Sequence, residues 1–486
     1  MKGEAGRLTH RLIDNALSFI GGDLFYHFVN FLAGILVARS LGSDAYGKFS
    51  FIFVYLSFFE IFVQFGMNSV LTREVSRNRD DAPRILGNAF LFRLALMALA
   101  IPAALFLIQG LGYAPPVRQG VGIASLLLFL GFRSIFETIF KVNLLMIYPA
   151  LWNGVRAVLN LALIAFFAGF RPELHLFILC YVCTGLLALA GLALFSRRFV
   201  RLSFKIDLPL IARLIRESFP LILSGCLTLL YVRVDVFMLS KMKSFTEVGF
   251  YGVAVRLTES LDIIATSVMI SLFPLLSRAF KESREEFARI SQKAVEILFL
   301  AGLPLAAGGI LVADELIVFL FGTEFAPAGL TLKILCGYTF FGFWSIFLVN
   351  LLIACGRQIV DMWISLFLLG SNVLLNFILI PHFSYNGAAA ATVLTEIFGI
   401  VWMSAYAAKN KSIALAPPRR ELAAALKANA FLLAALFLAK SLFRAPMFVL
   451  ILLAAPVYPL ILFSMGVLSW PGVRGYAASL WTKIQK

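Results

Sequence analysis

The chain has 486 residues, of which 61% are hydrophobic and only 14% are charged, and it carries a formal net charge of +16. A water-soluble domain has about 25% charged residues, so this composition excludes a soluble globular protein. The excess of Lys and Arg does not indicate nucleic-acid binding, because these residues are distributed over short segments between apolar runs instead of lying on one soluble face or arm.

Residues 1–16 form a polar, basic segment, in which we expect an interfacial helix and no cleavable signal peptide. Apolar runs of about 20 residues follow, the length that a helix needs to cross a hydrocarbon core of ~30 Å. We therefore predict an all-α polytopic membrane protein with about fourteen membrane-spanning helices and short loops. In chain order we place the helices at residues 17–38, 48–70, 86–110, 119–141, 144–169, 174–196, 215–241, 249–277, 292–312, 328–354, 358–381, 387–408, 421–441 and 446–470.

The distribution of Lys and Arg predicts the orientation, since segments on the cytoplasmic side of a membrane carry the excess of these residues. With the N-terminus inside, the inner segments hold 28 Lys and Arg and the outer segments hold 8. We therefore predict a multi-pass protein whose N-terminus and C-terminus are both cytoplasmic.

An internal repeat relates the two halves of the chain. Residues 36–62 align with residues 238–264 at an offset of 202, which pairs Arg39 with Lys241 and Gly47 with Gly249. Both copies lie in the first hairpin of a six-helix set, and such parallel repeats place a transported substrate between the two halves. We predict an N-lobe (residues 1–205), a C-lobe (206–412), and a last part (413–486) with two further helices and a cytoplasmic tail.

Basic residues inside the predicted spans are the most informative feature of the sequence. An Arg at mid-bilayer costs at least ~2.5–3.5 kcal/mol, so each must face a polar cavity, pair with an acid, or extend toward an interface. Six basic residues are in this position: Arg93, Arg133, Arg156, Arg233, Arg256 and Lys333.

Local explanations compete with a cavity for some of these residues. Arg133 has Glu137 four residues on and Arg256 has Glu259 three residues on, spacings at which helical side chains can pair. These two arginines are therefore candidates both for a cavity and for a structural ion pair.

Depth along the span separates the others. Arg93 lies about two turns from the cytoplasmic end of its span, and Lys333 enters from the outer side, so both could extend to an interface. Arg156 and Arg233 lie deeper and have no acid three or four residues away. We expect Arg156 and Arg233 to line a cavity.

A water-filled cavity lined with guanidinium groups attracts multivalent anions, because the planar donors match phosphate oxygens. Acids inside the spans could bind H⁺ or Na⁺ and couple its movement to transport, although pairing with the arginines or between helices explains them equally well. We take Glu60, Asp235, Glu259 and Glu396 as the coupling-ion candidates. No phosphate-binding loop is present, so ATP is not expected to drive the protein.

The sequence carries no signature of a catalytic or metal site. The four histidines are scattered without metal-ligand spacing, and the five cysteines lie in apolar runs, where they act as small hydrophobic residues. We therefore predict no catalytic residues, no metal and no cofactor, and a protein that is not an enzyme.

Four segments of the sequence carry a resemblance to a known family. They are LVARSLGSDAYGKFSF (36–51), RVDVFMLSKMKSFTEVGFYGVAVRL (233–257), LFGTEFAPAGLTLKIL (320–335) and SNVLLNFILIPHFSYNGAAAATVLTE (371–396). In these segments, which occur in the expected order over essentially the whole chain, the protein resembles the Wzx-type polysaccharide and O-antigen flippases of the MOP transporter superfamily.

The resemblance implies two six-helix lobes around a cationic cavity, with the last two helices beside a lateral groove. It implies alternating access and movement of undecaprenyl-pyrophosphate-linked oligosaccharide across the bacterial inner membrane, for lipopolysaccharide or another surface polysaccharide. By this resemblance Arg39, Arg233 and Arg256 are candidates for the pyrophosphate site, beside Arg133 and Arg156. Membrane lipids and other glycan-assembly proteins are the expected partners.

Two other functions compete with a flippase. An ion-coupled exporter of small molecules from the same superfamily would be expected to take cations and to carry acidic rather than basic residues in its spans. A membrane-embedded glycan polymerase or ligase would need outer loops large enough for a catalytic site, and the outer loops here are short.

Overall fold

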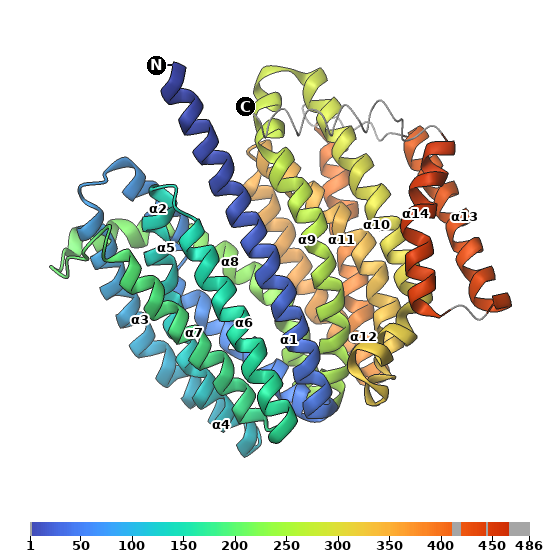
Figure 1. Cartoon of the computed structure of the whole chain (residues 1–486), viewed down its shortest axis with the longest axis horizontal. Coiled ribbons are helices and arrows are strands. Elements are labelled where there is room, and N and C mark those ends of the chain that lie inside the picture. Colours follow the sequence, from blue (N-terminus) through green and yellow to red (C-terminus); the bar gives the residue numbers. More distant parts are fainter. Residues whose placement is uncertain (1, 411–418, 444–445, 466–486) are drawn as a thin grey trace. The chain divides into compact units, whose positions relative to one another are not determined.

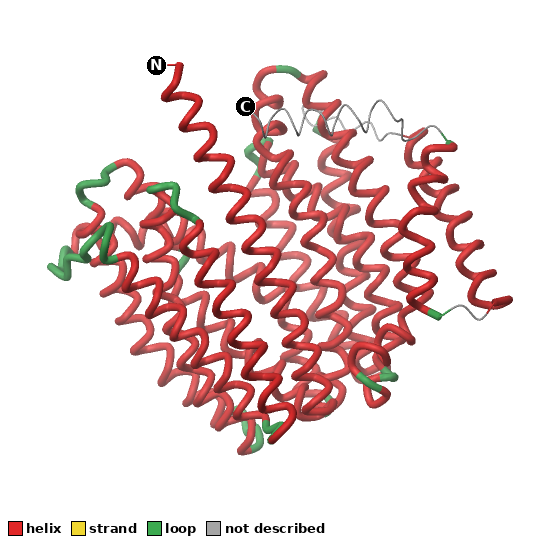
Figure 2. The backbone as a smooth tube through the Cα atoms, in the orientation of Figure 1, coloured by secondary structure: helices red, strands yellow, loops and turns green. Residues whose placement is uncertain are grey.

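The computed structural model describes residues 2–410, 419–443 and 446–465, and these residues form helices joined by short loops, with no strand among them (Figure 2). The first half of the chain contains nine helices in the described part. They are α1 (Lys2–Gln64), α2 (Met67–Arg77), α3 (Ala82–Gly110), α4 (Pro115–Ala124), the 3₁₀ helix η1 (Ser125–Phe132), α5 (Arg133–Val142), α6 (Ile147–Phe170), α7 (Leu174–Ser196) and α8 (Leu208–Met242).

The second half continues in the same way, with long helices and one short 3₁₀ turn (Figure 1). Its described helices are α9 (Phe245–Glu282), α10 (Arg284–Phe321), η2 (Thr323–Phe325), α11 (Ala328–Ala354), α12 (Gln358–Lys409), α13 (Arg419–Phe443) and α14 (Met447–Ser464).

Twelve helical segments of the described part are long and apolar enough to cross a membrane. Two of these, Gly21–Arg77 and Gln358–Lys409, are more than twice the length of one span. Each is broken near its middle, at Gly42 (φ 74°) and at Ser384 (φ 52°). Dividing both segments at these residues gives fourteen spans, which confirms the predicted polytopic fold.

The break at Gly42 supports the predicted repeat. At the offset of 202, Gly42 aligns with Ser244, and Ser244 is the residue that caps the start of α9. Its hydroxyl accepts from the backbone N–H of Glu247 while the Glu247 carboxylate accepts from the backbone N–H of Ser244, a reciprocal capping box. Both copies of the repeat therefore end one helix and begin the next at the same aligned position.

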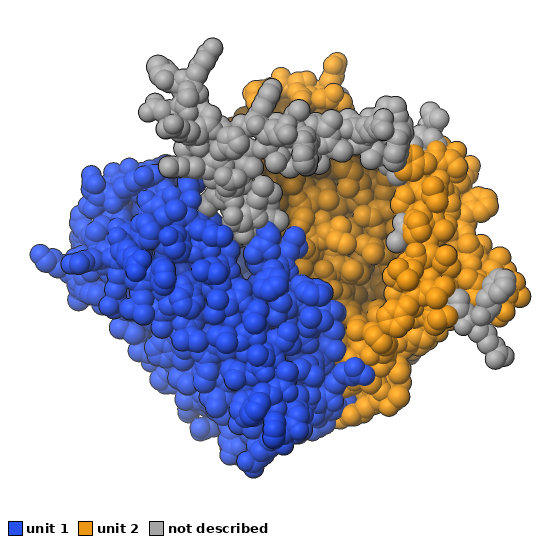
Figure 3. All heavy atoms as spheres, viewed as in Figure 1, with its two compact units in different colours: residues 1–233, 483–486 blue, residues 234–482 orange. Residues whose placement is uncertain are grey.

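The chain divides into two compact units, coloured separately in Figure 3, with the division between Arg233 and Val234 inside α8. The predicted lobe boundary at 205/206 lies in the loop before α8 and stays a prediction. In unit 1 the core is formed by apolar residues of α2, α3, η1, α5, α7 and α8, among them Met67, Leu86 and Phe140.

In unit 2, α13 and α14 pack on α10 through their own apolar cluster, which includes Val312, Leu432, Leu436 and Leu450 (Figure 1). The helices outside the repeat are thus held by apolar contact with α10. The predicted cytoplasmic tail lies outside the described residues.

Candidate functional site

A polar pocket of about 380 Å³ lies within unit 1. Four parts of the chain supply its walls: α1, the start of α2, the segment from η1 to α5, and α6. Its lining contains acids, bases, amides, a hydroxyl and two aromatic rings. The lining residues are Tyr26, Phe53, Glu60, Gln64, Asn68, Leu127, Leu130, Gly131, Arg133, Ser134, Glu137 and Arg156.

Two segments with irregular backbone form part of the pocket wall. α1 stops at Gln64, and Phe65 and Gly66 both have positive φ, 51° and 65°, before α2 begins. Only glycine fits at Gly66, since a Cβ there would lie 2.8 Å from the backbone nitrogen of Ile222. On the facing wall, η1 is an eight-residue 3₁₀ helix ending at Phe132, longer than such helices usually run.

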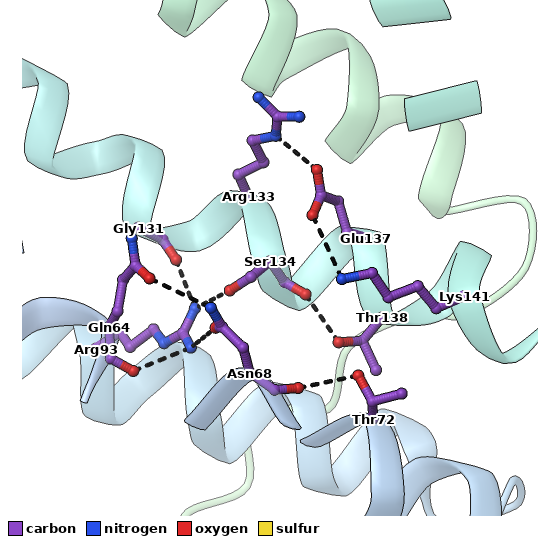
Figure 4. A network of polar contacts seen from close by, with 10 residues as sticks. All are labelled: Gln64, Asn68, Thr72, Arg93, Gly131, Arg133, Ser134, Glu137, Thr138 and Lys141. Carbon is purple, nitrogen blue, oxygen red and sulfur yellow. Dashed lines mark hydrogen bonds and ion pairs between the residues drawn. The ribbon is translucent and has the colours of Figure 1, made fainter. Parts of the chain in front are cut away.

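The irregular backbone is held by Arg93, whose side chain is 0% exposed. Its Nη1 donates to the carbonyl oxygen of Gly131 and to Ser134 Oγ, both at 2.5 Å. Its Nη2 donates to the carbonyl oxygen of Gln64 at 3.2 Å and to Asn68 Oδ1 at 2.9 Å (Figure 4). Arg93 therefore ties the α1–α2 break to the end of η1.

Arg93 is buried inside unit 1 and does not reach a membrane interface. The prediction from its position in the span, that its side chain could extend toward an interface, is wrong, because the side chain is fully buried. Buried charge is tolerated when most of its donors are satisfied. Here two freed backbone carbonyls and two polar side chains accept from Nη1 and Nη2, while Nε has no hydrogen-bond partner among the described residues.

Arg133 is paired within its own helix. Its Nε lies 2.6 Å from Glu137 Oε1, and Glu137 Oε2 lies 3.9 Å from Lys141 Nζ (Figure 4). The structural ion pair considered for Arg133 is thus confirmed. Arg133 and Glu137 still line the pocket, so they present both signs of charge to whatever enters it.

Arg156 is the pocket's available cation. No carboxylate within the described part of the chain lies within 4 Å of its guanidinium, whose central carbon is 5.8 Å from the centre of the Tyr26 ring. Glu60 is close enough to interact with Arg156 electrostatically, but its Oε1 accepts a 2.8 Å hydrogen bond from Gln64 Nε2. Arg156 therefore lines the pocket without an ion-pair partner among the described residues.

The chemistry of the lining fits a hydroxyl-rich group that carries negative charge. Guanidinium donors match phosphate or carboxylate oxygens, while amides and hydroxyls match the alternating donors and acceptors of sugar hydroxyls. Tyr26 and Phe53 add apolar ring faces. No element of this set resembles a metal site, and no cluster of three His, Cys, Asp or Glu suited to a metal occurs among the described residues.

A second polar cluster lies within unit 2 and is acidic. Asp262 on α9 lies near enough to Tyr338 on α11 to interact with its hydroxyl. Glu259 and Glu396 are near enough to Asp262 to interact with it electrostatically. Three carboxylates from α9 and α12 thus lie near enough within unit 2 to interact electrostatically, although they are not arranged as a metal site.

The remaining predicted residues are placed as follows. Asp235 is 5% exposed and accepts a hydrogen bond from the Tyr251 hydroxyl within unit 2. Arg39 is exposed on α1, and Arg233 and Arg256 are half-buried on α8 and α9. Of the predicted arginines, the structure brings Arg133 and Arg156 to one pocket; a shared chamber for all five stays a prediction.

Several residues that line the pocket were not predicted from the sequence. Gln64 and Asn68 follow Glu60 at successive intervals of four, a spacing that places polar groups on one helix face and could have identified them. In the acidic cluster of unit 2, Asp262 likewise continues a three-residue spacing from Glu259. Ser134 carries no such signal, because it acts through Arg93 on a different helix.

Comparison with known proteins gives the following similarities. The profile of a family described as "Polysaccharide biosynthesis protein" matches residues 12–280, and that of MatE matches residues 220–378. The capsular polysaccharide biosynthesis protein CapF of Staphylococcus aureus is 22% identical, over 76% of this chain and 93% of CapF.

Two further similarities extend over most of the chain. The probable flippase AglR of Haloferax volcanii is 23% identical, over 83% of this chain and 84% of AglR. The solved structure of the lipid II flippase MurJ in an inward closed conformation superposes with a TM-score of 0.77 at 14% identity, over 91% of this chain and 97% of that chain. This last likeness confirms the fold.

Proposed function

The chain belongs to the polysaccharide biosynthesis protein family, whose profile covers more than half of it, and we propose that it is a flippase for lipid-linked oligosaccharide. The substrate class is a polyprenyl-pyrophosphate-linked glycan, moved between leaflets for surface polysaccharide assembly. Two relatives carry matching descriptions, a capsular polysaccharide biosynthesis protein and a probable flippase.

The observation that carries the proposal is the polar pocket of unit 1 with its available guanidinium. Arg156 lies beside Tyr26 in the middle of α6, a helix long and apolar enough to cross a membrane, without an ion-pair partner within the described residues. Such placement has a free-energy cost that packing does not offset, whereas binding an anionic headgroup does. The amides and carboxylates around Arg156 suit the sugar hydroxyls next to the phosphate.

In the mechanism we propose, the headgroup enters the protein from the cytoplasmic side while the polyprenyl chain stays in lipid. Alternating access then exposes the headgroup on the outer side. The excess of basic residues on one side supports an orientation with both termini cytoplasmic in a bacterial inner membrane. Other glycan-assembly enzymes would supply the substrate and consume the product.

Energy coupling is proposed to use the in-span acids. Glu259, Glu396 and Asp262 form the acidic cluster of unit 2, and Glu60 and Asp235 are further candidates in units 1 and 2. Loading of the cluster by H⁺ or Na⁺ would relieve repulsion between carboxylates and link the movement of that ion to transport.

The function is tested with purified protein in proteoliposomes and a fluorescent lipid-linked oligosaccharide, scoring the fraction that becomes accessible on the opposite leaflet. Arg156→Gln removes the charge and should reduce the rate by about tenfold or more, since a charge-assisted hydrogen bond contributes about 1.5–3 kcal/mol. Arg156→Lys should retain part of the activity.

Arg278→Gln is the matched control, because Arg278 is 75% exposed and paired with Glu282 outside the pocket. It should transport at the original rate. Full activity of Arg156→Gln in a protein of unchanged thermal stability would contradict the assignment of the pocket.

The MatE profile match over residues 220–378 favours a second candidate, an ion-coupled exporter of small molecules. The acidic cluster of unit 2 would suit cationic substrates. Efflux of organic cations that is abolished by dissipating the ion gradient, together with no movement of lipid-linked oligosaccharide, would support this alternative.

A further inference from the structure

Unit 1 contains a second and larger cavity, of about 1000 Å³, which is separate from the polar pocket. It lies between α3, the η1–α5 segment and α7, and residues of the segment 197–204, which follows α7, also line it. Its wall is mostly aromatic and aliphatic, and it includes Phe90, Phe129, Phe132, Phe136 and Phe204. We refer to this cavity as the aromatic groove.

The walls of the groove are formed by aromatic rings that pack against one another. The rings of Phe90 and Phe132 stack with centroids 4.2 Å apart, and the ring of Phe204 meets that of Phe90 edge-on at 5.6 Å. Leu94 on α3 is 43% exposed and Ala190 on α7 is also exposed, and both line the groove. An apolar slot of this kind, between helices long and apolar enough to cross a membrane, accepts a hydrocarbon chain.

Three exposed arginines belong to the lining of the groove. Arg197, Arg198 and Arg201 line the cavity and are exposed. Within the described residues no carboxylate forms an ion pair with any of them, while Arg198 lies over the Phe195 ring at 5.3 Å. The sequence therefore places three uncompensated positive charges within five residues at the end of an apolar slot.

The segment 197–207, which contains the three arginines, is held against α3 by hydrogen bonds. The backbone N–H of Ser203 donates to the carbonyl oxygen of Pro83 at 2.9 Å. The Asn88 side chain donates to the carbonyl oxygen of Lys205 at 3.0 Å and accepts from the backbone N–H of Asp207 at 2.8 Å. A Cβ at Gly87 would lie 1.9 Å from the Ser203 oxygen, so only glycine allows this approach.

We propose that the aromatic groove binds one anionic phospholipid of the cytoplasmic leaflet. An acyl chain fills the slot, and the phosphodiester contacts Arg197, Arg198 and Arg201. Basic pockets between membrane helices on this side of the membrane bind anionic headgroups, and guanidinium donors suit phosphate oxygens. The leaflet follows from the orientation proposed above.

An apolar wall together with three arginines favours an anionic phospholipid over a free anion, a zwitterionic lipid or the carrier lipid of the substrate. A free anion has no use for an aromatic slot, and a zwitterionic lipid carries no net charge to compensate three arginines. The substrate's own carrier lipid shares both features, but it would be expected at the polar pocket, where Arg156 is located. Anionic phospholipid surrounds the protein at all times, so mass action favours its binding.

Occupancy has a structural consequence, because the η1–α5 segment is a wall of both cavities. Phe129, Phe132 and Phe136 face the aromatic groove, and Arg133 and Ser134 face the polar pocket. A bound lipid would therefore support the 3₁₀ helix from the side opposite the substrate pocket and should raise the thermal stability of the protein.

The test uses the full-length protein, delipidated in detergent, with phosphatidylglycerol or phosphatidylcholine added at equal concentration. Native mass spectrometry counts retained lipid, and tryptophan fluorescence gives Tm. We expect one tightly retained phosphatidylglycerol and a raised Tm. The triple variant Arg197→Gln, Arg198→Gln, Arg201→Gln should bind phosphatidylglycerol at least about tenfold more weakly.

Two further variants separate charge from shape. Ala190→Trp fills the slot at an exposed position and should abolish retention of the lipid while leaving the Tm of the delipidated protein unchanged. Arg278→Gln, Arg284→Gln, Arg289→Gln removes the same net charge from the exposed junction of α9 and α10 and should bind phosphatidylglycerol as the original protein does.

Four outcomes would overturn the proposal. The first is undiminished binding by the triple variant at the groove, and the second is equal retention of phosphatidylcholine. The third is the same rise in Tm with inorganic phosphate alone, which would indicate an anion site. The fourth is stoichiometric displacement by undecaprenyl phosphate, which would assign the groove to the carrier lipid. The readout is lipid binding, so the result is independent of transport activity.

Discussion

The guanidinium of Arg93 donates a 2.5 Å hydrogen bond to the carbonyl oxygen of Gly131, 38 residues further along the chain. Gly131 is near the end of the 3₁₀ helix η1, where carbonyl groups are not all used within the helix. The same guanidinium reaches the carbonyl oxygen of Gln64, where α1 stops. One buried cation thus stabilises two departures from helical geometry that shape the polar pocket.

Replacing Arg93 should therefore destabilise unit 1. Arg93→Met leaves four acceptors without their donor, and each buried unsatisfied group costs about 1–3 kcal/mol, so we expect a loss of several kcal/mol. Arg93→Lys keeps the charge but offers only three donors and should be intermediate. The measurement is Tm in detergent, with Arg278→Gln as an exposed control that leaves Tm unchanged. Unchanged Tm in Arg93→Met would contradict the role.

The break between α1 and α2 depends on Gly66. Gly66→Ala adds a side chain at φ +65°, and its Cβ would collide with the backbone of Ile222. Gly112→Ala is the matched control, since it has φ +71° with nothing within 4 Å. The control should cost about 1–2 kcal/mol from the left-handed backbone alone, and Gly66→Ala should cost clearly more. Equal losses of Tm would show that the close approach to α8 is unimportant.

Hydropathy was sufficient to predict the spans, because apolar length is what a bilayer requires of a helix. It placed breaks between residues 38 and 48 and between 381 and 387, where Gly42 and Ser384 interrupt the helices. The predicted span 48–70, however, runs through Phe65 and Gly66. No change of polarity marks that break, and it is stabilised by Arg93 from another helix.

The candidate site was predictable to the extent that its signals are local. Arg133 and Glu137 share one helix, so their spacing revealed the pair. Arg156 and Glu60 come from α6 and α1, and only the packing of these helices brings them together. The aromatic groove was not predicted, since its phenylalanines come from three separate segments and are indistinguishable by sequence from other membrane phenylalanines.

A double-mutant cycle should measure the coupling of Arg133 with Glu137. Glu137→Gln leaves the guanidinium uncompensated in a partly buried position, since Arg133 is 25% exposed and Glu137 16%. We expect each of Glu137→Gln and Arg133→Gln to lower Tm, and the double variant to lose less than the sum, with a coupling of about 0.5–3 kcal/mol. Additive losses would mean that the pair contributes nothing to stability.

Asp207 should make stability depend on pH. It lies in the loop before α8, and its pKa is lowered by a hydrogen bond from the backbone N–H of Leu210 and by Arg84. Because the pKa of Asp207 is lower in the folded state, its ionised carboxylate stabilises the folded protein at pH values above the unfolded pKa of about 3.9. This stabilisation is lost as the pH falls through the folded-state pKa. Asp207→Asn should thus lower Tm at pH 7, and the difference should shrink below about pH 4. A constant difference down to pH 3 would contradict this.

The acidic cluster of unit 2 should control coupling. Asp262→Asn removes one of three neighbouring carboxylates and leaves Glu259 and Glu396 in place. Repulsion between the carboxylates becomes weaker, and a bound cation or proton then stabilises the cluster less. We expect transport of fluorescent lipid-linked oligosaccharide in proteoliposomes to lose its response to an imposed proton or sodium gradient while gradient-free movement continues. Glu286→Gln, an acid that is 51% exposed at the start of α10, should keep the full response. If Asp262→Asn responds to the gradient as strongly as Glu286→Gln, the coupling ion binds elsewhere, and Glu60 and Asp235 become the residues to replace next.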